Sequence, residues 1–248
     1  MELRLFVFHH AGGSHLPYRG WPALLPSSWD VRLVDAPGRG LGADLEPIPD
    51  AERLVDHFLK HLDPELDGDY AFFGHSMGGL IAYELTRRIL DAGRVPPRWL
   101  GLSARSTPRP EGEGTQRHLL SDGELRRELV AMGGTPGAVL ENRDIWELFA
   151  PVIRNDLRLV ETWRPRPEST PMPVPLSVFG GRDDAVAPPE RLAGWADRAD
   201  RFLGLRLFEG GHFYFQPDPA AVLRQLVEDV HRALSPAEGP RRTAPVTG

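Results

Sequence analysis

The stretch that decides the fold reads Tyr-Ala-Phe-Phe-Gly-His-Ser-Met-Gly-Gly-Leu-Ile-Ala-Tyr-Glu-Leu, from Tyr70 to Leu85. Its first four residues are apolar, as in a buried strand, and the residues after Gly79 have the apolar periodicity of a helix. Between them stands Gly74-His75-Ser76-Met77-Gly78, which fits the G-x-S-x-G pattern of a sharp turn from strand to helix. Such a turn strains the backbone of the serine and crowds the positions two residues to either side, so both are glycine.

This turn makes Ser76 a candidate nucleophile. It lifts the serine hydroxyl above the sheet and directs the N-terminus of the next helix toward it, so the amide of Met77 can donate to an oxyanion. A serine hydroxyl is a poor nucleophile without a base. In the α/β-hydrolase fold, which uses this turn, an acid and then a histidine follow the serine along the chain. His212 comes after Gly210-Gly211, at the end of a predicted strand, and is the predicted general base.

Two adjacent aspartates precede that histidine at the place expected for the acid. The spacing Gly181-x-x-Asp184, with Pro188 four residues further on, fits the usual arrangement of this loop better for Asp184 than for Asp183. The acid holds the histidine in the tautomer that accepts the serine proton, and it stabilises the imidazolium that forms. We therefore predict Asp184 as the acid and keep Asp183 as the alternative.

A second oxyanion donor is expected from the loop after the first strand, which reads Phe-His-His-Ala-Gly-Gly-Ser at 8–14. The glycines let its backbone approach a substrate closely, and the amide of Ala11 is the predicted donor. The histidines His9, His10 and His15 could instead indicate a metal site, but no H-E-x-x-H pattern joins them, and none is predicted. His75, inside the turn, is expected to pack beneath it and not to act as a second base.

Short apolar runs alternate with longer amphipathic ones, which is typical of a parallel sheet covered by helices. Strands are predicted at Leu3–Phe8, Asp30–Val34, Tyr70–Phe73, Arg98–Leu102, Val174–Phe179 and Gly204–Phe208. Helices are predicted at Ala51–Leu62, Met77–Ala92, Pro189–Arg198 and Pro219–Leu234. The predicted fold class is α/β, an α/β-hydrolase fold with a mostly parallel central sheet flanked by helices.

One segment interrupts this alternation. Residues 108–172 have helical signals at Asp122–Met132 and Asp144–Thr162, no convincing strand, and proline-rich ends that could serve as hinges. We predict a helical lid there, inserted into a hydrolase core formed by 1–107 and 173–234. An ordinary pair of crossover helices is the alternative. Residues 235–248 are rich in proline and glycine and lack periodicity, which predicts a disordered tail.

Composition narrows the class of function. The 248-residue chain has a net charge of −6, which argues against nucleic acid as a partner because phosphate binding favours a basic surface. It has no cysteine, which excludes disulfides, cysteine nucleophiles and thiolate metal sites. The sequence shows no signal peptide and no apolar run near the ~20 residues of a membrane span. We expect a cytoplasmic monomer that needs no membrane and no cofactor.

Five short motifs together resemble one family. They are His-Ala-Gly-Gly-Ser at 10–14, Ala-Pro-Gly-Arg at 36–39, Gly-His-Ser-Met-Gly-Gly at 74–79, Ile-Arg-Asn-Asp-Leu at 153–157 and Gly-Gly-His-Phe-Tyr-Phe at 210–215. In this combination the chain is similar to the type II thioesterases, the discrete editing hydrolases of polyketide and nonribosomal peptide synthesis, from about Leu3 to Leu234. It departs from them at 40–43, where a second arginine is frequent, and at His9, where proline is usual.

The resemblance implies a mechanism and a partner. It makes Ser76 the nucleophile, Asp184 the acid and His212 the base, with the amides of Ala11 and Met77 as the oxyanion hole. The substrate would be an acyl thioester on the phosphopantetheine arm of an acyl or peptidyl carrier protein. The enzyme would remove stalled or wrongly primed acyl groups from synthase modules, and no cofactor is implied.

Three other functions fit parts of the sequence. A carboxylesterase or lipase would use the same serine chemistry on oxygen esters. A chain-terminating or cyclising thioesterase would usually be fused to a synthase. A hydrolase fold without activity could serve as a binding protein, although such proteins usually lose a triad member, and here all three positions are filled.

Overall fold

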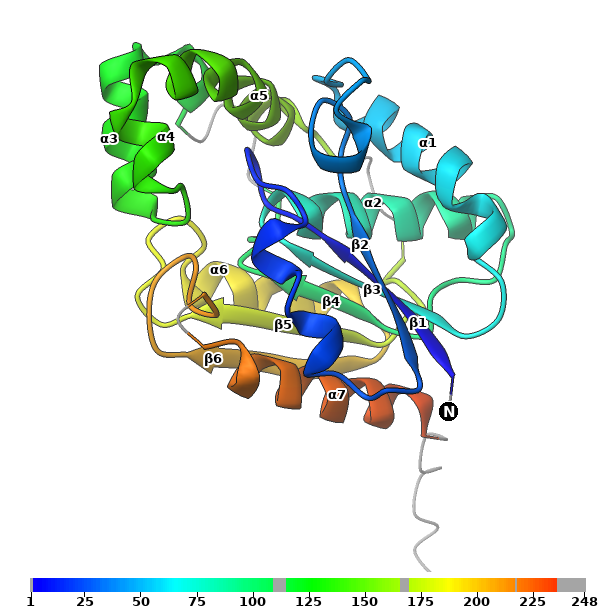
Figure 1. Ribbon diagram of the computed structural model, residues 1–248. Coiled ribbons are helices and arrows are strands. Elements are labelled where there is room, and N and C mark those ends of the chain that lie inside the picture. The colour runs from blue at the N-terminus through cyan, green and yellow to red at the C-terminus, as the bar shows by residue number, and fades with distance from the viewer. Residues whose placement is uncertain (1, 109–114, 166–169, 217, 236–248) are drawn as a thin grey trace, which may run out of the picture.

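A computed structural model describes residues 2–108, 115–165, 170–216 and 218–235. Its centre is a six-stranded sheet in the order β2-β1-β3-β4-β5-β6, in which every adjacent pair runs parallel (Figure 1). The strands are β1 (Leu3–Phe8), β2 (Trp29–Val34), β3 (Tyr70–His75), β4 (Leu100–Ser103), β5 (Leu176–Gly181) and β6 (Phe202–Phe208). All six predicted strands are present with small shifts at their ends, and the predicted parallel sheet is confirmed.

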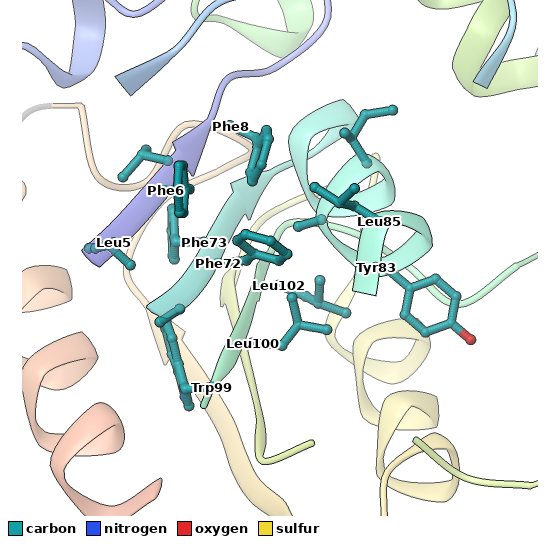
Figure 2. Packing of buried hydrophobic residues seen from close by; sticks show 14 of the residues in the cluster. Leu5, Phe6, Phe8, Phe72, Phe73, Tyr83, Leu85, Trp99, Leu100 and Leu102 are labelled. Carbon is teal, nitrogen blue, oxygen red and sulfur yellow. The ribbon is translucent and has the colours of Figure 1, made fainter. Parts of the chain in front are cut away.

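Apolar side chains cover the central strands on both faces, as parallel sheets require. Successive residues of β3 point to opposite faces. Phe72 contacts Phe8, whereas Phe73 contacts Trp21 of the segment between β1 and β2. Figure 2 shows Phe72 on the side of the helix that follows β3, and Phe73 with Trp99 on the other side. Because β3 is buried along its whole length, the turn that follows it rises from a rigid support.

Helices cover both faces of the sheet. The helices α1 (Ala51–Leu62) and α2 (Met77–Asp91) pack against each other on one face, and α7 (Ala220–Leu234) lies on the other (Figures 1 and 2). Helix α1 begins at a capping residue, Asp50, whose side chain accepts a hydrogen bond from the amide of Arg53. The helix predicted over 189–198 divides into α6 (Pro189–Ala193) and a 3₁₀ turn over Gly194–Arg198.

The segment between β4 and β5 is helical in the part that the structure describes. It contains α3 (Asp122–Met132), α4 (Gly137–Glu141) and α5 (Arg143–Thr162). A capping box of Ser121 and Glu124 starts α3, and Asn142 caps α5. The five-residue α4 was not predicted, because it is too short to show a periodic pattern. Two of the predicted hinge prolines, Pro110 and Pro167, and nearly all of the predicted tail fall within 109–114, 166–169 and 236–248, outside the described residues.

These three helices have a small hydrophobic core of their own, separate from the main one, and group to one side of the sheet in Figure 1. Its buried members are Leu125, Leu129, Trp146, Ala150, Ile153 and Leu157. Ala11, in the loop after β1, packs against both this small core and the main core. The helical segment therefore adjoins the loop after β1.

The strand order reverses between β1 and β3, because β2 lies on one side of β1 and the later strands lie on the other. At such a switch point the loops that leave the carboxyl ends of the two strands diverge and open a crevice, where open α/β sheets bind their ligands. The loop after β1 and the turn at 74–78 both start there. The topology thus places the two predicted oxyanion donors at the same edge.

Candidate active site

The turn after β3 has the backbone strain that its glycines predict. Ser76 has φ 55° and ψ −109°, a positive φ that residues other than glycine rarely adopt. A Cβ on Gly74 would lie 2.0 Å from the carbonyl oxygen of Gly78. The amide of Ser76 donates to the carbonyl of Ser103 at the end of β4, over 2.7 Å. Neighbouring strands thus hold the strained residue in place.

Gly78 allows α2 to begin directly against β1. Replacing it by alanine is expected to destabilise the fold by about 1–3 kcal/mol, because the new Cβ would lie 2.1 Å from the carbonyl oxygen of Phe8. Urea denaturation measures the loss. Gly20→Ala is the control, since no atom lies within 4 Å of its Cβ position, and it is expected to stay within about 0.5 kcal/mol of wild type. Equal stability of the two variants would contradict this packing.

Ser76, His212 and Asp184 form a continuous chain of hydrogen bonds. A serine that directly precedes a helix commonly accepts a hydrogen bond from one of the first helical amides with its hydroxyl oxygen. The hydroxyl of Ser76 makes no such bond. Its Oγ lies 3.1 Å from Nε2 of His212 instead, and Nδ1 of His212 lies 2.8 Å from Oδ2 of Asp184. With its proton on Nδ1, the imidazole donates to Asp184 and presents Nε2 as the acceptor of the serine proton.

The two neighbouring aspartates differ in their surroundings. Asp184 is buried, and its Oδ1 accepts hydrogen bonds from the amides of Val186 and Ala187, over 2.8 and 3.0 Å. Burial raises the pKa of Asp184, but the hydrogen bond from His212 and those two amides outweigh it, and the pKa lies below its usual value. Asp183 is exposed. The structure brings Asp184, and not Asp183, into contact with His212.

His75 lies beneath the turn, as expected. It is fully buried, and its Nδ1 lies 2.8 Å from Oγ of Ser103, which in turn lies 2.6 Å from the hydroxyl of Tyr214. Burial lowers the pKa of His75 far below its ordinary value, so the ring is neutral. Its ring centroid lies 5.1 Å from that of His212. Sequence reasoning missed the supporting roles of Ser103 and Tyr214, although Tyr214 belongs to the Gly-Gly-His-Phe-Tyr-Phe motif.

The loop after β1 is fixed by its histidines. Nε2 of His9 accepts a hydrogen bond from the amide of Ala36, over 3.1 Å, and Nδ1 donates to the carbonyl of His10 over 2.7 Å. His9 thus ties the loop after β1 to the loop after β2. Burial, reinforced by the charge of Arg39, lowers the pKa of His9 to about 4, and burial lowers that of His10 to about 3. Both rings are neutral supports of the loop that contains Ala11.

The neutral histidines His9, His10 and His75 are expected to make the fold sensitive to acid. Unfolded, each takes up a proton near pH 6.5, but in the folded protein each stays neutral until a much lower pH. The unfolded state therefore binds more protons between about pH 4 and 6.5, and stability rises with pH across that window. Three such groups give a slope of up to about 4 kcal/mol per pH unit.

Urea denaturation at pH 7, 6 and 5 measures this slope. The full contribution is present above pH 6.5 and is lost as the pH falls. Replacing His10 by glutamine is expected to lower the slope by about a third, because one proton fewer is taken up on unfolding. A free energy of unfolding that stays constant from pH 7 to pH 5 would contradict the burial of neutral imidazoles.

The loop that contains the predicted oxyanion donor Ala11 starts beside the turn, and the other predicted donor, Met77, belongs to the turn. The carbonyls of Phe8 and His9 approach the Cβ position of Gly78 to 2.1 and 2.7 Å, so the loop that contains Ala11 starts against the first turn of α2. Met77 is the first residue of α2, and the first amides of a helix have no partner within the helix.

Within the described residues, no three His, Cys, Asp or Glu side chains gather as a metal site, and no helix is long and apolar enough to span a membrane.

Comparison with known proteins agrees with this geometry. The family model of the thioesterase domain matches residues 3–234. The chain belongs to the thioesterase family. The gramicidin S biosynthesis protein GrsT of Aneurinibacillus migulanus is 28% identical to this thioesterase. The match covers 95% of the thioesterase and 91% of GrsT.

Solved structures extend the comparison to the fold. The type II thioesterase BorB, from the borrelidin biosynthetic cluster, superposes on the thioesterase with a TM-score of 0.82 and 34% identity, over 93% of each chain. ClbQ, from the colibactin NRPS/PKS pathway, superposes with a TM-score of 0.87 and 27% identity, over 94% of this chain and 98% of ClbQ. The predicted α/β-hydrolase fold and the resemblance to type II thioesterases are confirmed, and the thioesterase is a hydrolase that acts on thioesters.

Proposed function

We propose that the thioesterase removes acyl groups from the phosphopantetheine arm of acyl or peptidyl carrier proteins and so clears synthase modules that carry a stalled or wrong group. The hydrogen-bonded chain from Ser76 through His212 to Asp184 carries this proposal. Relatives named for gramicidin S, borrelidin and colibactin biosynthesis support the partner, since such assembly lines hold their intermediates as thioesters.

The first half of the reaction acylates the serine. His212 takes the proton of Ser76 on Nε2 while Oγ attacks the thioester carbonyl. Asp184 stabilises the imidazolium that forms, and its lowered pKa keeps it ionised for this purpose. The tetrahedral intermediate collapses, the C–S bond breaks, and the pantetheine thiol leaves with the proton that His212 returns.

Two backbone amides, those of Ala11 and Met77, hold the oxyanion in both halves of the reaction. A donor of this kind is worth about 3–4 kcal/mol of transition-state stabilisation. In the second half, His212 removes a proton from water, which attacks the acyl-enzyme. Collapse of the second intermediate returns the proton to Ser76 and releases a carboxylic acid. Every group named comes from one chain, so we propose that it acts as a monomer.

The helices α3, α4 and α5 serve in this proposal as the lid over the acyl site. The contact of Ala11 with their small core supports it, because the same residue that supplies an oxyanion amide touches the helical segment. Substrates then reach the serine along the edge of the sheet where the lid and the loop after β1 meet.

The proposal is tested with acetyl, propionyl and butyryl groups loaded onto a phosphopantetheinylated carrier protein, with release followed by intact-protein mass spectrometry. Release from the carrier is expected to be faster than from the matched acyl-pantetheine, and Ser76→Ala abolishes it. p-Nitrophenyl esters serve as the second substrate. Survival of the carrier-bound groups, with cleavage of the oxygen esters, would point to a carboxylesterase.

A further inference from the structure

Two motifs of the sequence take no part in the triad, yet they meet in the structure. Arg39 ends Ala-Pro-Gly-Arg in the loop after β2, and Asp156 belongs to Ile-Arg-Asn-Asp-Leu in the middle of α5. Nη1 and Nη2 of Arg39 bind the two oxygens of Asp156, the second over 2.8 Å. The two side chains are only 7% and 1% exposed, so the ion pair is buried between the helical segment and the core.

The carboxylate of Asp156 also binds the loop after β1. The amide of Gly12 donates to Oδ2 of Asp156 over 2.7 Å. Gly12 follows Ala11 directly and has φ 71°. A Cβ there would lie 2.7 Å from Cγ1 of Ile153, one turn before Asp156 on the same helix. Only glycine lets the loop lie this close to α5.

A buried carboxylate that accepts a backbone amide and faces a guanidinium holds that amide strongly, because both bonds are charge-assisted and shielded from water. The peptide plane between Ala11 and Gly12 is rigid. Fixing the amide of Gly12 therefore restricts the backbone at Ala11, whose own amide must point at the oxyanion. Oxyanion donors act through their preorganisation, so a small loss of order at this loop lowers the rate of the chemical step.

We propose that Asp156 is a positioning residue that orders the oxyanion loop from the lid, with Arg39 as its counter-ion. This inference rests on the role proposed above for Ala11. It makes α5 a fixed part of the active site.

The test compares two double variants that both remove the buried charges, Arg39→Met/Asp156→Asn and Arg39→Met/Asp156→Leu. Asparagine and leucine have similar shapes, but only asparagine retains an oxygen for the amide of Gly12. The leucine variant is expected to have a kcat about 10- to 100-fold below that of the asparagine variant, with little change in KM. An alkyl trifluoromethyl ketone, which forms an oxyanion on Ser76, is expected to lose affinity by the same factor.

Three readouts separate positioning from stability. A non-hydrolysable thioether analogue of the substrate is expected to bind both variants equally, because it forms no oxyanion. Asp229→Asn removes the charge of another buried carboxylate, which Arg206 binds between α7 and β6, and is expected to lower the melting temperature without changing kcat. The Gly12 amide of the wild-type protein is expected to be protected from hydrogen exchange as well as the amides of α5 are.

Equal kcat values for the two double variants would overturn the inference, and so would a Gly12 amide that exchanges as fast as that of a free loop. The exchange measurement needs no variant, so it can overturn the inference even if the leucine variant does not fold. All rates are also measured with p-nitrophenyl acetate, which uses the same serine. If the wild-type protein cleaves this ester but not carrier-bound thioesters, the proposed function is wrong. The role of Asp156 can still be tested, because the two double variants can be compared on the ester.

Discussion

Replacing Ser76 by alanine is expected to lower kcat for thioester hydrolysis by about 10⁵- to 10⁶-fold. The variant lacks the atom that becomes acylated, and no other hydroxyl shares the hydrogen bond to Nε2 of His212 among the described residues. The variant still binds the substrate and still has the oxyanion amides, and these alone are expected to keep its rate slightly above that of the uncatalysed reaction in water. Single-turnover release from an acylated carrier protein measures the loss, and mass spectrometry shows whether an acyl-enzyme still forms.

The members of a triad act as a unit, so their losses do not add. The variant His212→Ala alone, and the double variant with Ser76→Ala, are both expected to be about as slow as Ser76→Ala. Circular dichroism and thermal melting confirm that each variant is folded. A Ser76→Ala protein that retains more than about one hundredth of the wild-type kcat would show that another group is the nucleophile.

The variant Asp184→Asn is expected to lower kcat by about 10⁴-fold with little effect on the fold. The asparagine has the same shape, but its amide no longer offers a carboxylate to Nδ1 of His212, so the imidazole loses the tautomer that accepts the serine proton. Asp183→Asn is the matched control, because it makes the same chemical change on the adjacent, exposed residue. It is expected to stay within about threefold of wild type, since exposed positions outside the site contribute little.

Steady-state rates for the two aspartate variants, taken with the same acyl-pantetheine, decide between the alternative acids. A large loss for Asp183→Asn with a small one for Asp184→Asn would reverse the assignment. Similarly large losses of kcat for both variants would mean that the conformation of the whole loop, and not one carboxylate, keeps His212 active.

Much of the fold could be predicted because its signals are local. Each strand is a short apolar run, and the turn at 74–78 carries its own steric reason for two glycines. The preference for Asp184 over Asp183 rests on spacing alone, and in the structure Asp184 is the buried one of the two and accepts hydrogen bonds from two backbone amides. The strands, the turn and the spacing of the aspartate loop each depend on residues that are close together in the sequence, so a single sequence is enough to predict them.

The contacts between distant segments could not be predicted in the same way. Arg39 and Asp156 are 117 residues apart, and nothing near either residue indicates the other. Likewise His9 looks like a possible metal ligand in the sequence, and only its burial and the amide of Ala36 identify it as a neutral support. Such pairs are set by how the helical segment packs on the core, a property of the whole chain.

The parallel sheet also sets when the activity appears during folding. Ser76 lies 136 residues before His212, and the loops that supply Asp184 and His212 exist only after β5 and β6 have joined the sheet. Non-local pairing of this kind forms late, because long loops must close before the contacts are made. A chain whose last strand, β6, has not yet joined the sheet therefore lacks the base, and we expect it to be unable to cleave thioesters.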